Sequence, residues 1–207
     1  KKGEIKNAIK SIAQALRLPI EINLAYVSED YDPQAQGNKF QSTDIAKVHD
    51  HGSGGESIIA QVVIPRDLPF FGSQKLNGFQ IDVKMTENAH NYAPAFVLIM
   101  AHELSHILLY SLQHKHKENE FYTDLTAMMN GFHEVFKEGR KKITKDTNHI
   151  TNIETTSTVT YGYLNDEQFE FAYNKICSLL NDGISQSKSL SKQINGIEML
   201  LMKQSQT

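Results

Sequence analysis

Three residues of the chain, His102, Glu103 and His106, have the types and the spacing that metal-dependent hydrolysis needs. On a helix, side chains four residues apart lie on the same face one turn apart, so both imidazoles can reach the same ion. Glu103 lies one step around the helix, where its carboxylate can reach a water on that ion without binding the ion itself. The pattern predicts two metal-ligating histidines and a glutamate general base.

The residues around this pattern favour a functional site over a chance match. Residues 93–112 form the longest apolar window of the chain, and the ionisable run lies in its middle. Burying such groups is costly unless each is paired or bound to a metal ion, and a metal site would meet that need. The same groups argue against a lipid-exposed helix, so we expect no membrane span in this chain.

A catalytic zinc needs a third protein ligand and an open position for water. Glu120 and Asp124 are again four residues apart, at the start of a second predicted helix that a short loop turns back antiparallel to the first. We expect Glu120 to bind the ion and Asp124 to hydrogen-bond the far ring nitrogen of a ligand histidine. The converse, with Asp124 as the third ligand, stays open, as does an acidic first helical turn without a metal role.

His114 and His116 are a weaker alternative for the third ligand. They follow the same helix that carries the first two histidines, and from its end their side chains do not easily reach back to the ion. A solvated loop is the better interpretation of this segment.

The elements that must position these residues follow from hydrophobic periodicity. The central helix is apolar on every side before its first histidine, begins after a cap at Asn91 with Pro94 in its first turn, and runs to about Leu112. Further helices are predicted at residues 4–17, 120–137, 166–180 and 190–202.

Strands are predicted where apolar and polar residues alternate or where a short apolar run stands between turn residues. They cover residues 20–27, 57–65 and 79–85. Residues 28–56 are interpreted as a long surface loop with a short helix near 43–48, and residues 140–160 as a mobile loop, because both are polar and rich in turn-forming residues.

Composition narrows the class of protein. The net charge is −3, with 21 basic and 24 acidic residues, which gives no electrostatic footprint for nucleic acid. The one cysteine, Cys177, cannot form an internal disulfide, which fits a reducing compartment such as the cytoplasm. Residues 4–18 are amphipathic, so we expect no signal peptide there, and because the chain begins with Lys1 we expect a piece of a longer protein.

The run His102-Glu103-x-x-His106 followed by Glu120-x-x-x-Asp124 resembles the gluzincins, the thermolysin-like side of the zincin superfamily. The short spacing and the strand-then-helix lead-in look most like the compact ImmA/IrrE-type peptidases. The resemblance covers residues 79–131. The metzincin pattern does not fit, because it would place glycine at 109 and histidine at 112, where this chain has leucines.

The resemblance implies a single α+β, zincin-like domain over residues 1–207, in which a small mixed sheet packs on the buried helix that carries the histidines. Active-site helices would span about 93–138 and further helices about 166–203. An edge strand, from 79–85 or 57–64, would pair with an extended peptide substrate. Tyr161, Tyr163 and His149 are candidates for stabilising the oxyanion.

The function so implied is zinc-dependent peptide hydrolysis with one zinc per chain, in which Glu103 moves the proton of the metal-bound water. The expected partner is a protein or peptide substrate. The alternative is a regulatory zinc-binding sensor with the same fold and little or no turnover. A purely structural zinc site is less favoured, because such sites are usually closed by four cysteine or histidine ligands.

Overall fold

The structure is a computed structural model that describes residues 2–28, 41–45, 47–49, 59–87, 91–148 and 153–181. The chain divides into two compact units, residues 1–164 and residues 165–207. All of the residues expected at the metal site belong to the first unit. One domain over the whole chain stays a prediction.

The first unit is an α+β structure built on a mixed four-stranded sheet, with the strand order β1-β5-β4-β2. The neighbouring strands β1 and β5 are parallel, whereas β4 is antiparallel to both of its neighbours. The strands are β1 (Ile20–Val27), β5 (Phe79–Thr86), β4 (Ile59–Val63) and β2 (Gln41–Ile45).

Alternation along the strands supplies the core face of this sheet. In β1 the residues Ile20, Ile22 and Leu24 are buried while those between them are exposed. The parallel register aligns Ile22 with Ile81 on β5, so the apolar side chains of both strands lie on the same face. The predicted strands over 20–27 and 79–85 are confirmed, the second being one residue longer.

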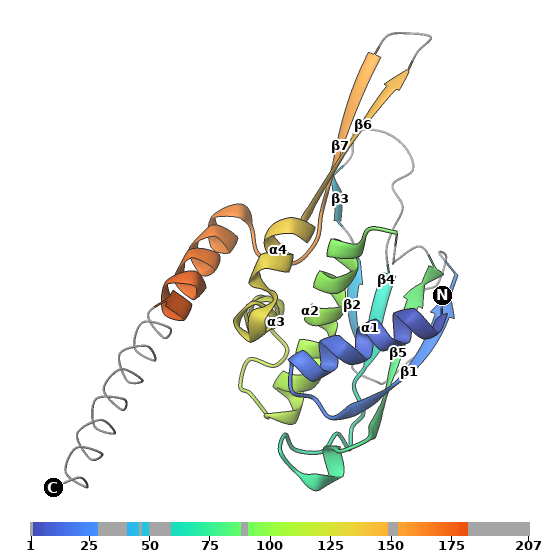
Figure 1. Cartoon of the computed structure of the whole chain (residues 1–207), viewed down its shortest axis with the longest axis vertical. Helices are drawn as coiled ribbons and strands as arrows, with labels where there is room; N and C mark the ends of the chain where they lie inside the picture. Colours follow the sequence, from blue (N-terminus) through green and yellow to red (C-terminus); the bar gives the residue numbers. More distant parts are fainter. Residues whose placement is uncertain are drawn as a thin grey trace, which may run out of the picture. The chain divides into compact units, whose positions relative to one another are not determined.

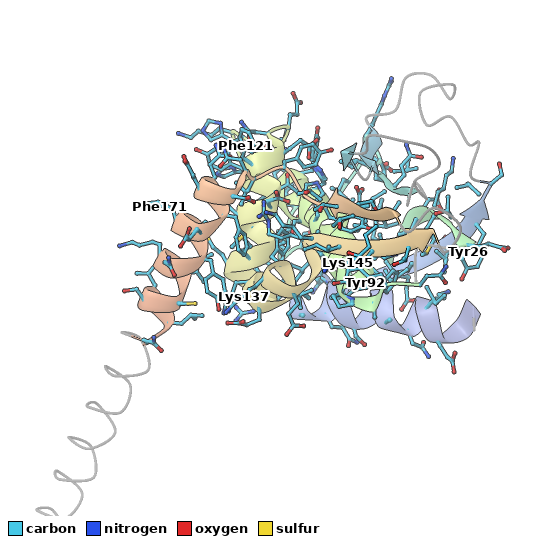
Figure 2. The ribbon with its side chains drawn as sticks, turned by 90° about the horizontal axis from the view of Figure 1, so that it is seen from above. Tyr26, Tyr92, Phe121, Lys137, Lys145 and Phe171 are labelled. Atoms are coloured by element: carbon cyan, nitrogen blue, oxygen red, sulfur yellow. The ribbon has the colours of Figure 1, made fainter. Side chains whose placement is uncertain are left out.

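Two helices pack against the sheet, α1 (Lys2–Ala15) on β1 and α2 (Ala93–Ser111) on β4 and β2 (Figure 1). Pro94 lies in the first turn of α2 as predicted, but the N-cap is Tyr92 and not Asn91. Tyr92 Oη donates to the Glu138 carbonyl at 3.0 Å, and its ring lies 6.0 Å from Lys142 Nζ (Figure 2). By length and composition α2 could cross a membrane, and 78% of its apolar window is buried inside the protein.

The second predicted helix is interrupted, so the expectation of one helix over 120–137 is wrong. It consists of α3 (Glu120–Ala127), the π-helical turn η4 (Met128–Phe132) and α4 (His133–Gly139). The break lies at Gly131, whose φ of 103° no continuous helix accommodates. A short 3-10 turn, η2 (Gln74–Leu76), precedes β5.

Two segments interpreted as loops contain strands, and both expectations are wrong. β6 (Lys141–Asn148) and β7 (Ile153–Thr160) form an antiparallel hairpin that β3 (Lys47–His49) extends in the order β3-β7-β6. β2 and β3 replace the short helix expected near 43–48. The segment 140–160 is rich in threonine, which suits strands, but both segments lack the alternating apolar pattern by which a half-buried strand is recognised.

The sheet order also corrects the expected substrate edge. Among the described residues, β5 is paired on both sides, by β1 and β4, and β4 is paired on both sides, by β5 and β2. Neither 79–85 nor 57–64 therefore provides a free edge. The edges of the four-stranded sheet are β1 and β2, and β2 is the edge beside α2.

In the second unit, residues 166–181 form a helix, as predicted. A reciprocal capping pair begins it: Gln168 N donates to Asn165 Oδ1 at 2.9 Å, and Asn165 N donates to Gln168 Oε1 at 3.0 Å. The helix expected at 190–202 lies outside the described residues.

Candidate metal centre

The structure brings His102, His106 and Glu120 together. The two histidines lie on one face of α2, and Glu120 is the first residue of α3, whose start is fixed by Asn119 Oδ1 accepting from Phe121 N at 3.0 Å. Glu120 Oε2 lies 3.1 Å from Nε2 of both histidines. One ligand atom from each of the three residues lies within 4.8 Å of the others, which is the separation of groups that can hold a metal ion.

The other ring nitrogen of each histidine is engaged by the protein. His102 Nδ1 lies 2.7 Å from Asp124 Oδ1, and both side chains are almost fully buried. His106 Nδ1 lies 3.4 Å from Thr123 Oγ1. When Nδ1 donates to these acceptors, the lone pair of Nε2 is left for a metal.

The donor set fits a divalent metal ion. His106 Nε2 is buried and makes no hydrogen bond, although it lies 3.1 Å from Glu120 Oε2. A buried ring nitrogen of this kind costs free energy unless it binds something. Two imidazoles and one carboxylate are ligands that zinc accepts, and three protein ligands leave a position for water.

The electrostatics of the cluster favour the ligand forms of these groups. Burial lowers the pKa of His106, and this outweighs the opposing effect of Glu120. Burial by itself would raise the pKa of Glu120, but the close contacts with the two histidines and their charge lower it to about 2. Both shifts favour what a metal ion requires, a neutral imidazole and an ionised carboxylate.

Glu103 lies beside the cluster and does not take part in it. Its side chain is fully buried, and Oε2 accepts a hydrogen bond from Val62 N of β4 at 3.1 Å. A strand of the sheet therefore holds the carboxylate. This backbone contact could not be foreseen, because a main-chain N–H leaves no mark in the residue pattern.

Asp124 also joins the cluster to the turn that follows β7. Its second oxygen, Oδ2, accepts from Tyr163 N at 2.7 Å and from Leu164 N at 3.1 Å. Gly162 has a φ of 83°, which lets the chain turn toward the carboxylate. The Tyr163 ring stacks on the His102 ring, with centroids 5.3 Å apart and 24° between the planes.

The remaining predicted candidates are described by other contacts. Tyr161 is buried, and its N–H donates to the Arg140 carbonyl at 2.8 Å. His116 stacks on Tyr122 with ring centroids 4.2 Å apart, and His114 packs against both rings. His149 lies outside the described residues.

Comparison of the chain with protein-family models, with curated proteins and with solved structures finds no match in any of the three. The case for a function therefore rests on the residues and on their geometry.

Proposed function

We propose that the chain is a zinc-dependent metalloendopeptidase of the zincin type, with His102, His106 and Glu120 as the ligands of one zinc ion. The observation that carries this is that Glu120 Oε2 lies 3.1 Å from the Nε2 atoms of both His102 and His106. The buried carboxylate of Glu103 follows His102 on the same helix. Zinc so bound would supply a polarised water and a Lewis acid for the scissile carbonyl.

The protein's own groups have separate tasks in this proposal. Glu103 takes the proton of the attacking water and later passes it to the leaving amine, while the Val62 N–H holds its other oxygen in place. Asp124 keeps the His102 ring oriented through Nδ1. Tyr163, whose ring lies against His102, is the candidate to donate to the oxyanion; buried Tyr161 is less suited to it.

The edge of the sheet supports a zincin-like arrangement of the substrate. Among the described residues β2 is the edge strand beside α2, and a strand at the edge of a sheet can accept an extended peptide as one more strand. We propose β2 as the strand that binds the substrate backbone, in place of the interior strands that the resemblance suggested.

The test measures bound metal and peptide cleavage on the purified chain and four variants: Glu103→Gln, His106→Ala, Glu120→Ala and the control Glu118→Gln. Wild type should bind one zinc and cleave an unfolded protein substrate such as casein. Glu103→Gln should keep the metal and lose cleavage about 10²–10⁴-fold. His106→Ala and Glu120→Ala should lose both, and Glu118→Gln should match wild type, because Glu118 is exposed and lies outside the ligand set.

Each result decides between the competing functions. Failure of wild type to bind any divalent metal would rule out the metal centre. Stoichiometric zinc without cleavage of any substrate, in wild type as in Glu103→Gln, would favour the regulatory sensor with little turnover.

A further inference from the structure

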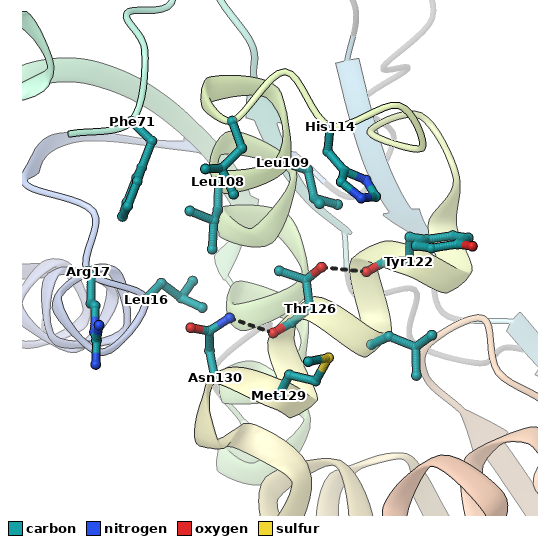
Figure 3. A pocket seen from close by; sticks show the side chains of 12 residues that line it. Leu16, Arg17, Phe71, Leu108, Leu109, His114, Tyr122, Thr126, Met129 and Asn130 are labelled. Carbon is teal, nitrogen blue, oxygen red and sulfur yellow. Dashed lines mark hydrogen bonds between the residues drawn. The ribbon is translucent and has the colours of Figure 1, made fainter. Parts of the chain in front are cut away.

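A second candidate site lies outside the metal centre, in an apolar pocket of about 510 Å³. The end of α1, the last turns of α2 and the outer face of α3 and η4 line it (Figure 3). The proposed ligands His102, His106 and Glu120 do not line it, and neither do Glu103 and Asp124. The pocket is therefore independent of the proposed peptidase activity.

The floor of this pocket is buried and its rim is apolar and exposed. Leu16, Leu108 and Leu109 are at most 6% exposed, whereas Leu112 is 51% exposed and Met129 is 70% exposed. Exposed large apolar side chains gathered around a hollow typify a surface that another molecule covers. Met129 suits such a rim, because its unbranched thioether chain adapts to different partners.

The polar side chains of the pocket are turned into the helix that carries them. Thr126 Oγ1 donates to the Tyr122 carbonyl at 2.7 Å, and Asn130 Nδ2 donates to the Thr126 carbonyl at 2.8 Å, as Figure 3 shows. Because these two side chains donate to backbone carbonyls of their own helix, the pocket offers a ligand mainly apolar contacts.

The charge at the edge of the pocket is positive. Arg17 lines it, and no acidic residue is among its lining residues. Arg17 is exposed, and its guanidinium forms no hydrogen bond or ion pair with the described residues. An occupant with an acidic group next to its apolar side would complement this edge.

Arg17 also holds a backbone conformation that favours glycine. It ends α1 with a φ of 57°, where its N–H donates to the Gln14 carbonyl and Leu18 N donates to the Ala13 carbonyl. This is the helix-ending motif in which glycine is the usual residue. An arginine at a strained position beside an apolar pocket points to a role for its side chain.

We propose that this pocket docks an amphipathic acidic segment of a partner protein, whose apolar side chains fill the floor and whose carboxylates meet Arg17. A protein segment fits better than a small molecule. Small ligands are mostly enclosed by their sites, whereas this rim is open to solvent at Leu112 and Met129. A helix laid in a groove needs only one buried face.

The test selects peptides from a phage-displayed random library on the full chain, after removing those that bind the Met129→Glu variant. Enriched peptides should combine apolar residues at helical spacing with Asp or Glu. Their affinity should fall about tenfold or more in Met129→Glu, as at a central interface contact. It should fall roughly three- to fivefold in Arg17→Gly, the size expected of an exposed ion pair.

Two controls separate binding from folding. Arg17→Gly should hold or raise the melting temperature while it weakens binding, because glycine accepts the left-handed conformation without strain. Ile143→Glu replaces an exposed apolar residue of β6 that does not line the pocket, and it should bind like wild type.

The proposal is overturned if no enriched peptide depends on Met129, or if the enriched peptides are basic. It is also overturned if Met129-dependent binding is found only for oleate or for anionic phospholipid vesicles, because the pocket would then take a lipid. Each measurement is made with and without added zinc, and peptide binding that persists without zinc separates this pocket from the metal centre.

Discussion

Asp124 Oδ1 lies 2.7 Å from Nδ1 of His102, and each of the two side chains is only 1% exposed. The other oxygen of the same carboxylate accepts hydrogen bonds from the backbone N–H groups of Tyr163 and Leu164. One buried carboxylate therefore orients a candidate metal ligand and closes the turn that follows the β6–β7 hairpin. Metal affinity and the stability of this turn should depend on it together.

Replacing Asp124 with alanine should weaken metal binding by about 10–100-fold, the usual effect of losing a carboxylate behind a ligand histidine. It should also destabilise the fold by about 1–3 kcal/mol, because buried N–H groups lose their acceptor. Competition with a chromophoric chelator and urea unfolding measure the two effects. Asp82→Ala is the control, since Asp82 is exposed and pairs with Asn23 on the far strands. Unchanged metal affinity in Asp124→Ala would contradict the orienting role.

Gly162→Ala should lower the metal affinity, whereas Gly72→Ala should leave it unchanged. Both glycines have a φ near 80°, so alanine costs about 1–2 kcal/mol at either position. Only at residue 162 would the new Cβ meet another group, Asp124 Oδ2 at 3.2 Å. We therefore expect a fall in metal affinity for Gly162→Ala alone, measured by chelator competition. Equal affinities of the two variants would show that the turn does not act on Asp124.

Gly139→Ala should destabilise the packing of α4 on α2. A Cβ at residue 139 would lie 2.6 Å from the backbone oxygen of Pro94, which no flexible side chain can relieve. Overpacking of this kind costs about 1–3 kcal/mol. Thermal unfolding should show the loss. The control is Gly3→Ala in α1, which meets nothing within 4 Å and should be neutral or slightly stabilising.

Removing the metal should lower the melting temperature of wild type. An ion that binds only the folded state stabilises it by about 4 kcal/mol when present at a thousand times its dissociation constant. Differential scanning fluorimetry with EDTA and with added zinc measures the shift. In His106→Ala the melting temperature should be the same under both conditions. A shift of equal size in that variant would mean that zinc binds elsewhere on the protein.

Several parts of the fold could be predicted because their signals are local. Strand β1 alternates buried and exposed residues, and α2 joins a proline in its first turn to a long apolar run. The spacing of four between His102 and His106, and again between Glu120 and Asp124, places each pair on one helix face wherever the helix lies. For this reason the four candidates could be named before their positions in space were known.

Other features have no local signal. In the sequence, Gly131 looks like a glycine that a continuous helix tolerates, although the helix breaks there. The polar sequences of β2, β6 and β7 look like those of loops. A strand with few apolar residues is recognised by its partner's hydrogen bonds, and that partner is distant in sequence. The strand order β1-β5-β4-β2, which makes 79–85 an interior strand, likewise depends on pairing between strands that are distant in sequence.

By itself the sequence determined the chemistry that is available: two imidazoles, a neighbouring glutamate and two further carboxylates at helical spacing. Only the tertiary structure decided which histidine nitrogen each carboxylate contacts. Glu120 contacts Nε2 of both histidines, and Asp124 contacts Nδ1 of His102. The tertiary structure also decided that the Val62 N–H holds Glu103. The physical reason is that helical periodicity depends on neighbours along the chain, whereas these contacts depend on how α3 and β4 pack against α2.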